Sequence, residues 1–510
     1  MKAVVLAGGY GTRLWPLTLT RPKPMLLLGG KPALHYIIEY LSNHGFDEII
    51  ITANYLRNSI MDYFGRCSEL DVKLIYSDEY SPLGTAGSVK NVANYLDDTF
   101  AVIQGDNITD IDLTKMLEFH KKKGGDATIA LKEVEKPYFF GIVKMNSEEQ
   151  ILLFKEKPKA SECFSNMINT GIYMLEPKIL DYVPSDKEFD FAKDLFPQLL
   201  NSNKKIYGFK AEGFWVDIGT PEGYLEASNW LLSKLKGRSI SGAEVKDAII
   251  KGPLVIGKDS KVDDNAMIYG PAVIGDRCHI ESGAIIDSYT MIESDVEVST
   301  NTSVRKSIIY KDTFVGPYSL LDGCIIAEGC NIGLGVKISD KSIVGAGCEI
   351  GHLTNIQNGS KIWPSIKVRP KSVVKGFVRH LEQIYQPEIG LEKIISETKI
   401  IDKENARRIL ERLPPEKAFY FFKGIGDYIG QVANSLDEFC NLLNVVSVDS
   451  IEFHVKRNDF ENWIKFIGDL ELANCIKKSG EKNLRGKALR KEIHDLVEKR
   501  CRELHKVIDQ

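Results

Sequence analysis

Apolar and polar positions alternate in three different ways along the chain, and each pattern predicts a different architecture. In residues 1–235, short β-rich apolar runs alternate with stretches of helical periodicity, beginning with residues 3–6, 32–44, 48–53 and 72–76. Strands that alternate with helices predict βαβ units and a mainly parallel sheet. Ligands of such sheets bind beyond the carboxyl ends of the strands, so the loops at that edge are where we expect chemistry.

An apolar residue recurs at every sixth position in residues 245–375. The first frame comprises Ile250, Ile256, Val262, Ile268, Ile274, Ile280, Ile286, Ile292, Val298 and Val304. After a slip of four residues, the second comprises Ile308, Phe314, Leu320, Ile326, Ile332, Ile338, Val344, Ile350, Ile356, Ile362, Val368 and Val374. A helix with about 3.6 residues per turn cannot keep this period on one face, whereas stacked coils of short strands can. The pattern predicts a β-solenoid with an irregular coil after Val304, and it resembles the left-handed parallel β-helix of hexapeptide-repeat proteins.

Residues 377–510 follow a third pattern, in which apolar positions have helical spacing. The last part carries one stripe, made of Leu489, Ile493, Leu496, Val497, Leu504, Val507 and Ile508. The run Phe419–Phe422 is interpreted as core, because no basic residues are interleaved with it as in a base-stacking surface. We expect a mostly α-helical domain with its own core, and a helix start after Pro414–Pro415.

Composition narrows the class of protein. The 510 residues are 43% hydrophobic and 27% charged, which is typical of a folded chain of several domains. A net charge of −4 gives no electrostatic reason to expect nucleic acid or an anionic membrane as a partner. The first apolar run is too short for a signal peptide, and nine scattered cysteines indicate free thiols in a reducing cytoplasm.

The first strand is followed by a glycine loop and then by basic residues. The segment 6–14 reads Leu-Ala-Gly-Gly-Tyr-Gly-Thr-Arg-Leu, and 21–24 reads Arg-Pro-Lys-Pro. Glycines let backbone N–H groups approach phosphate oxygens, and an arginine and a lysine add charged donors. Leu14 stands where a dinucleotide fingerprint has its third glycine, and no P-loop Gly-Lys-Ser/Thr is present. The loop is therefore a phosphate site of another kind.

The longer string resembles the signature of the sugar-phosphate nucleotidyltransferases, and further matches follow in the family's order. They are Leu83–Gly87, Gln104–Asn107, Phe139–Val143, Phe154–Pro158, Asn169–Tyr173 and Trp215–Pro221. The resemblance covers residues 1–230 and continues through the repeat to about residue 375. It implies a Rossmann-like α/β catalytic domain, and the helical tail resembles appendages that follow some archaeal-type members. The family often has Tyr where Phe140 stands, which removes one hydroxyl.

The resemblance also implies the roles of individual residues. It implies that the nucleotide is contacted by Leu6, Ala7, Gly8, Gly9, Gly11, Thr12, Arg13, Lys23, Glu79, Gly84 and Thr85. Sugar-phosphate contacts fall to Asp106, Gly141, Glu156, Lys157 and Asn169. Asp106 and Asp217 would hold Mg²⁺, and Arg13, Lys23, Lys157 and Asp106 would be the catalytic set. Attack of one phosphate on another brings anions together, so positioning and charge stabilisation should dominate catalysis.

The sequence favours GTP and mannose 1-phosphate as substrates, by resemblance to the mannose-1-phosphate guanylyltransferases. A glucose-1-phosphate uridylyl- or thymidylyltransferase is the alternative within the class. A non-catalytic regulatory homologue is the alternative of another class, although the chain keeps the basic residues and carboxylates that such relatives tend to lose. A third hypothesis adds acyltransferase activity in the solenoid.

His279 and His352 lie in the solenoid, but neither has a surrounding acyltransferase motif, so both are interpreted as structural. Cys324, Cys330 and Cys348 are interpreted as small buried thiols rather than a metal site. Stacked coils present flat faces that can pair between subunits, so we expect a homo-oligomer formed through the β-helix.

Overall fold

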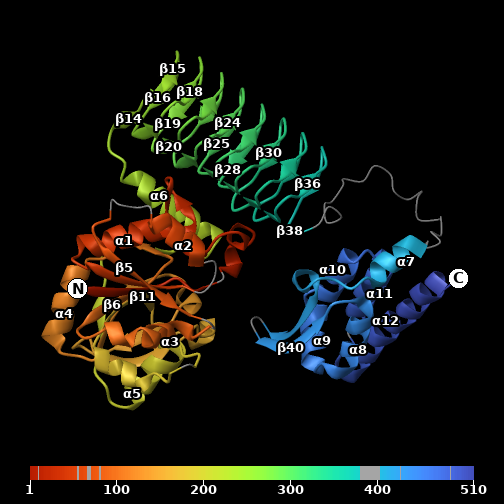
Figure 1. The fold of residues 1–510 in the computed structure, drawn as a ribbon, viewed down its shortest axis with the longest axis horizontal. Helices are drawn as coiled ribbons and strands as arrows, with labels where there is room; N and C mark the ends of the chain where they lie inside the picture. Colours follow the sequence, from red (N-terminus) through yellow and green to blue (C-terminus); the bar gives the residue numbers. More distant parts are fainter. Residues whose placement is uncertain are drawn as a thin grey trace. The chain divides into compact units, whose positions relative to one another are not determined.

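A computed structural model describes the chain at residues 1–9, 11–53, 57–65, 70–79, 82–185, 187–379, 403–424, 427–482 and 484–509. The chain divides into two compact units, residues 1–387 and 388–510. The first unit contains an α/β domain and a β-solenoid, and the second is built mainly of helices (Figure 1). Among the described residues, no helix is long and apolar enough to cross a membrane.

The α/β domain is organised around a sheet whose strand order is β10-β9-β11-β6-β1-β4-β5, in which β8 also pairs with β11, and β12 pairs with β8. Its strands are β1 (Lys2–Leu6), β4 (Glu48–Ala53), β5 (Lys73–Asp78), β6 (Phe100–Gln104), β8 (Ala127–Glu133), β9 (Ile142–Met145), β10 (Ile151–Lys155), β11 (Met167–Leu175) and β12 (Ile206–Lys210). The neighbours β6, β1, β4 and β5 are parallel, as the pattern predicts. Because β11 pairs antiparallel with β6, β8 and β9, the sheet is mixed rather than mainly parallel. Apolar runs identify strands without encoding their direction, so the sequence pattern could not reveal this.

Helices cover both faces of this sheet. Figure 1 shows α1 and α2 along one face and α3 and α5 along the other. The helices are α1 (Ala33–Asn43), α2 (Arg57–Phe64), α3 (Gly84–Asn91), α4 (Leu113–Lys123), α5 (Phe196–Asn201) and α6 (Pro221–Ser233). Two buried clusters result: α1, α2, α4 and α6 pack in one, and α3 and α5 in the other. The loops that carry chemistry are therefore left at the edge of the sheet.

The solenoid consists of short strands from β14 (Arg238–Ile240) to β38 (Phe377–Val378), arranged in three parallel sheets of nine, eight and eight strands. Its buried core is the column of Ile and Val side chains that the six-residue period predicts. After Val304, however, the inward residues are Ile309, Val315 and Leu321, whereas Phe314 is half-buried and Leu320 is exposed. The expected frame through Ile308, Phe314 and Leu320 is wrong by one residue, and Ile308 is buried against the α/β domain instead of in the solenoid core. Each lies beside another apolar residue, and adjacent strand residues face opposite sides, so the period alone cannot choose between them.

One sheet of the solenoid packs directly on the α/β domain. Ile308, Tyr310, Ile325 and Ile343 join the same buried cluster as α1 and α6. Tyr224 lies on α6, and Tyr310 directly follows β26 (Ile308–Ile309). Their hydroxyl oxygens are 2.8 Å apart, and both side chains are fully buried. The α/β domain and the solenoid therefore share a core in this unit.

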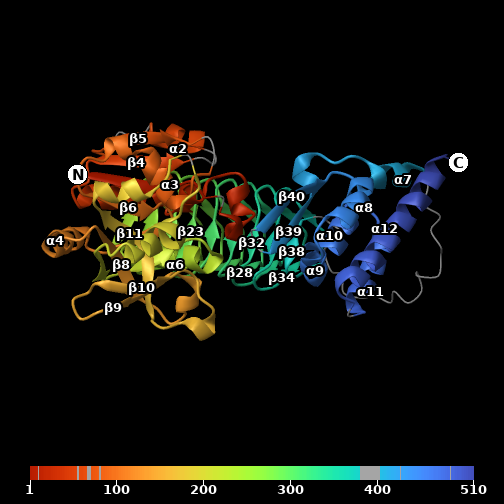
Figure 2. The same ribbon diagram turned by 90° about the horizontal axis from the view of Figure 1, so that it is seen from below.

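The second unit contains α7 (Lys403–Leu410), β39 (Phe419–Gly424), β40 (Asp427–Ala433), α8 (Leu436–Val445), α9 (Val448–Lys456), α10 (Asp459–Phe466), α11 (Leu470–Glu481) and α12 (Gly486–Asp509). Figure 2 shows the long α12 beside α11. The hairpin β39–β40 was not expected. Of the run interpreted as core, Phe419 and Phe421 are buried, whereas Phe422 is half-buried and Tyr420 is exposed, because alternate residues of a strand face opposite sides. The α-helix expected to start after Pro414–Pro415 is absent there, and a single 3₁₀ turn, Pro415–Lys417, stands in its place.

Candidate active site

The glycine loop and Asp106 leave the sheet side by side. Strands β1 and β6 are parallel neighbours in which Leu6 is opposite Gln104, so their carboxyl ends coincide. The N–H of Gly105 donates to the carbonyl of Leu6 at 2.8 Å, and a Cβ at residue 105 would lie 2.9 Å from that oxygen. This position needs glycine for a close approach, and it puts the next residue, Asp106, beside the loop.

A short antiparallel ladder brings the second carboxylate to the same place. In this ladder β7 (Asn107–Thr109) pairs with β13 (Trp215–Asp217), and Asp217 is opposite Asn107. The N–H of Ile218 donates to the carbonyl of Asp106 at 3.0 Å. Two carboxylates that are distant in sequence are therefore fixed as neighbours by backbone pairing.

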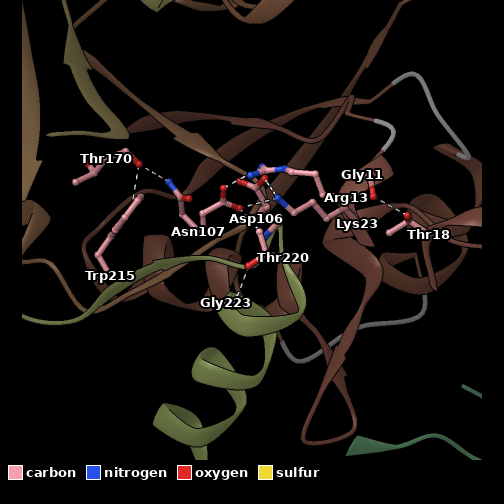
Figure 3. Close-up of polar contacts among 12 residues, drawn as sticks. Gly11, Arg13, Thr18, Lys23, Asp106, Asn107, Thr170, Trp215, Thr220 and Gly223 are labelled. Atoms are coloured by element: carbon pink, nitrogen blue, oxygen red, sulfur yellow. Dashed lines mark hydrogen bonds and ion pairs between the residues drawn. The ribbon is translucent and has the colours of Figure 1, made fainter. Parts of the chain in front are cut away.

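Lys23 lies between the two carboxylates, as Figure 3 shows for Asp106. Its Nζ contacts Asp106 and is 2.7 Å from Oδ1 of Asp217, and its side chain is only 7% exposed. Nη2 of Arg13 is 3.3 Å from Oδ2 of Asp217, but the Arg13 side chain is mostly exposed. The sequence placed Lys23 on phosphate. The geometry shows Lys23 paired with both carboxylates, and its contact with phosphate stays a prediction.

The charges in this cluster oppose the effect of burial. Burial by itself would lower the pKa of Lys23, but the carboxylates of Asp106 and Asp217 outweigh it and raise that pKa. Burial would likewise raise the pKa of Asp217, but Lys23 and Arg13 hold it below its ordinary value. For Asp106, burial prevails over Lys23 and its pKa is raised. The site is thus an acidic pair held together by one buried ammonium group.

Gly219 is a site residue that the sequence reasoning quoted in a motif without assigning a role. Its N–H donates to Oδ1 of Asp217 at 2.7 Å. A Cβ there would lie 2.6 Å from Nη2 of Arg13 and 2.7 Å from Nζ of Lys23. The signal that could have found it is its spacing, two residues after the carboxylate. Any side chain at 219 would displace the cations from Asp217.

We expect Gly219→Ala to reduce the rate of the reaction at this site by about tenfold to a hundredfold, because the added methyl group would push the cations away from Asp217. The displaced atoms are the ends of flexible side chains, so the unfolding temperature should change little. Steady-state kinetics and thermal unfolding measure the two effects. Gly424→Ala, where a Cβ would make only an ordinary contact with Cβ of Asp427 at 3.9 Å, is the matched control. Unchanged kinetics in Gly219→Ala would show that the cluster tolerates the added methyl group.

A second polar network extends from the cluster toward the expected sugar side. The carbonyl of Thr170 accepts hydrogen bonds from Nδ2 of Asn107 at 2.6 Å and from Nε1 of Trp215 at 3.0 Å (Figure 3). The ring of Trp215 packs edge-on against Phe140, with centroids 5.6 Å apart. The bulge of β11 at Gly171, which has φ of +79°, brings the carbonyl there. Phe140 and Trp215 therefore form an aromatic contact beside this polar network.

The residues expected at the sugar phosphate gather only in part. The N–H of Asn169 donates to the carbonyl of Gly141 at 2.8 Å, and a Cβ at Gly141 would lie 2.6 Å from Oε2 of Glu156. Lys157 is mostly exposed, with Nζ 3.7 Å from Glu156. Its contact with a sugar phosphate stays a prediction.

The expected nucleobase side is formed around the start of α3. Gly84 has φ of +70°, and its Cβ would meet the backbone of Phe189 at 2.6 Å. The hydroxyl of Thr85 donates to Asp190 at 2.9 Å, so this side chain also fixes the neighbouring loop. Oε1 of Glu79 is buried and has no hydrogen-bond partner among the residues that the structure describes. The pKa of Glu79 is raised because burial outweighs its hydrogen bond to Ser88.

Three family models match successive parts of the chain. Residues 2–234 match the family model "Nucleotidyl transferase", 268–378 match "GMPPB C-terminal domain", and 391–498 match a family of unknown function (DUF5752). A UTP–glucose-1-phosphate uridylyltransferase of Synechocystis is 37% identical over 409 residues, which are 76% of this chain and 100% of the relative. The chain belongs to the sugar-1-phosphate nucleotidyltransferase family. Arg13, Lys23, Asp106 and Asp217 all lie within the segment that the nucleotidyl transferase model matches. Their assignment to the catalytic site of this family stays a prediction.

Two further relatives are named for a different base and sugar. A "Mannose-1-phosphate guanylyltransferase catalytic subunit beta" of Dictyostelium discoideum is 35% identical over 368 residues, 71% of this chain and 96% of the relative. "Mannose-1-phosphate guanylyltransferase 1" of Arabidopsis thaliana is 32% identical over 358 residues, 69% and 96% of the two chains. The family is thus shared by relatives that use different bases and sugars.

The solenoid side chains that were set aside have structural partners. Nε2 of His279 is 2.8 Å from Asp263, and Nδ1 of His352 accepts the N–H of Leu334 at 2.9 Å. Cys324, Cys330 and Cys348 are buried free thiols in the core of the coils, as interpreted.

Proposed function

We propose that this nucleotidyltransferase joins GTP to mannose 1-phosphate and releases pyrophosphate. An oxygen of the sugar phosphate would form a bond to the α-phosphorus of GTP, while the bond from that phosphorus to the pyrophosphate oxygen breaks and its electron pair leaves with pyrophosphate. Arg13 and Lys23 would contact the triphosphate, and Lys157 would orient the attacking phosphate. The reaction needs little proton transfer, so fixed positive charge would supply most of the stabilisation.

Asp106 and Asp217 fit a magnesium ion. Mg²⁺ prefers oxygen ligands and is often bound by one or two carboxylates together with substrate phosphates. Here two carboxylates are paired by backbone hydrogen bonds and share one cation, Lys23. Bound there, the ion would neutralise phosphate charge. Lys23 would then be free to exchange carboxylate contacts for phosphate contacts.

The choice of guanine rests on Oε1 of Glu79, a buried oxygen that has no hydrogen-bond partner in the described part of the chain. A carboxylate only accepts hydrogen bonds, and guanine offers adjacent N1–H and N2–H donors to it. Uracil and thymine offer one N–H flanked by two carbonyl oxygens, which a carboxylate would repel. A buried acceptor without a donor is costly, and a guanine edge would remove that cost.

The choice of mannose is supported by the match to the "GMPPB C-terminal domain" model and by the guanylyltransferases among the relatives. UDP-glucose synthesis is the second candidate, because the Synechocystis uridylyltransferase aligns over its full length. Association through the solenoid also stays a prediction. Tyr318, Leu320 and Leu353 are large apolar side chains exposed on its surface.

Glu79→Gln tests whether the Glu79 carboxylate recognises the guanine base. A glutamine amide both accepts and donates, so it suits uracil better than guanine. We expect kcat/KM for GTP to fall by at least about tenfold, from the unpaired donor it creates, and the GTP-to-UTP ratio to fall further. Pyrophosphate release with each nucleotide measures this, and Glu118→Gln on the exposed face of α4 is the control. An unchanged GTP-to-UTP ratio would exclude Glu79 from base recognition.

A further inference from the structure

The solenoid holds the phosphate-binding loop at three points. Nζ of Lys361 on β35 (Lys361–Ile362) donates to the backbone carbonyl of Arg13 at 2.5 Å. Arg21 forms an ion pair with Glu328 at 2.6 Å, and its guanidinium lies over the ring of Tyr310. The hydroxyl of Tyr310 also accepts the N–H of Leu27 at 3.3 Å. These contacts run from one end of the loop to the other.

The same solenoid contacts the segment that follows the second carboxylate. Lys341 pairs with Glu222 at 3.4 Å, and Glu222 lies in the first turn of α6, five residues after Asp217. Tyr224, on the next part of that turn, shares its hydrogen bond with Tyr310. Arg13 and Asp217, whose side chains meet at 3.3 Å, are thus each adjacent to a backbone segment held by the solenoid.

The loop has little regular structure to fix its own shape. Between β1 and α1 it forms three single 3₁₀ turns, Thr12–Leu14, Leu17–Leu19 and Lys23–Met25, and the two-residue strands β2 (Leu27–Leu28) and β3 (Lys31–Pro32). Such a segment depends on outside contacts for its conformation. The Lys361 ammonium is half-buried, and burial lowers its pKa below the ordinary value. Its hydrogen bond to the Arg13 carbonyl is therefore made in a partly dry environment, where such bonds are stronger.

We propose that Lys361 of the solenoid is a positioning residue for catalysis, acting through the backbone of Arg13 to fix the cation that grips the triphosphate. The solenoid then contributes to the reaction as well as to folding. Assigning the triphosphate to Arg13 rests on the proposed function, but the control of the loop by Lys361 does not. A misplaced charged group costs activity even when it is far from the reacting atoms.

Kinetics of Lys361→Met test the catalytic part. Methionine keeps the length and apolar character of the side chain but cannot donate. We expect the KM for GTP to rise about tenfold, as for loss of a charged hydrogen bond, and the KM for mannose 1-phosphate to stay unchanged. Lys361→Arg, which keeps a cationic donor, should recover most of the loss. Lys337→Met is the matched control, because Lys337 is an exposed lysine on β31 (Lys337–Ile338) of the same solenoid.

Hydrogen–deuterium exchange of the substrate-free protein tests the positioning itself and needs no knowledge of the substrates. Amides of residues 11–25 should exchange faster in Lys361→Met than in the wild type or Lys337→Met, while β1 and β6 stay protected. If wild-type protein prefers UTP, the same variants are compared with UTP and glucose 1-phosphate. Equal exchange in all variants would overturn the proposal. So would an equal rise in both KM values accompanied by a lower unfolding temperature, since that pattern indicates a purely structural role.

Discussion

Replacing Asp106 by asparagine is expected to lower kcat for pyrophosphate release by at least about a hundredfold. The substitution keeps the shape and the backbone contacts of the residue, including the hydrogen bond from Ile218 to its carbonyl. It removes one of the two carboxylates that fit Mg²⁺. The remaining carboxylate, Asp217, still pairs with Lys23, so the fold should be preserved. Initial rates of pyrophosphate release over a range of Mg²⁺ concentrations measure the effect.

Asp62→Asn is the control for this prediction, because Asp62 is an exposed residue of α2. It should keep wild-type kinetics and wild-type dependence on Mg²⁺. Near-normal release by Asp106→Asn at all Mg²⁺ concentrations would remove Asp106 from the metal site. Loss of activity together with a much lower unfolding temperature would require the reciprocal variant, Asp217→Asn, before a catalytic role is assigned.

Lys23→Met is the second variant for which we expect a large effect. Lys23 is the buried cation shared by Asp106 and Asp217, so its removal leaves Asp106 without an ion-pair partner and Asp217 with only the exposed Arg13. We expect kcat to fall by about a hundredfold or more, because a triphosphate donor is lost. Without metal, breaking the buried pair should lower the unfolding temperature by about 5 °C or more. Mg²⁺ should raise the unfolding temperature more in the variant than in the wild type, because no Lys23 ammonium competes with it for the carboxylates.

Thermal unfolding with and without Mg²⁺ separates this idea from a simple loss of packing. Lys144→Met, at an exposed position of β9, is the control and should show the wild-type response. If Mg²⁺ stabilised Lys23→Met no more than the wild type, the ion and Lys23 would not share Asp106 and Asp217. The account of the acidic pair would then be wrong, even if activity were lost.

The sequence predicted the fold to a large extent because the fold depends on periodicity. The six-residue repeat identified the solenoid, and the frame error at Phe314 and Leu320 arose only where two adjacent residues are both apolar. The hairpin β39–β40 was missed because its aromatic run is equally compatible with a helix core. Strand direction around β11 was missed because apolar patterns do not encode it.

The candidate site was predictable for residues that stand in motifs, and less so for contacts made across the chain. Motif order correctly selected Arg13, Lys23, Asp106 and Asp217 as residues that meet, although their catalytic roles remain predictions. The bridging position of Lys23 depends on the β7–β13 ladder, which no local pattern specifies. The contact between Lys361 and Arg13 joins residues 348 positions apart and depends on how the solenoid packs.

The central proposal, that GTP and mannose 1-phosphate are joined at the acidic pair, is tested most directly by product analysis with purified protein. The protein is incubated with Mg²⁺ and each of four pairs, GTP or UTP with mannose 1-phosphate or glucose 1-phosphate, and pyrophosphate and nucleotide sugar are both quantified. We predict equal amounts of GDP-mannose and pyrophosphate, with GTP and mannose 1-phosphate as the best pair and no product after chelation of the metal. A best rate with UTP and glucose 1-phosphate, or undiminished product after chelation, would contradict the account.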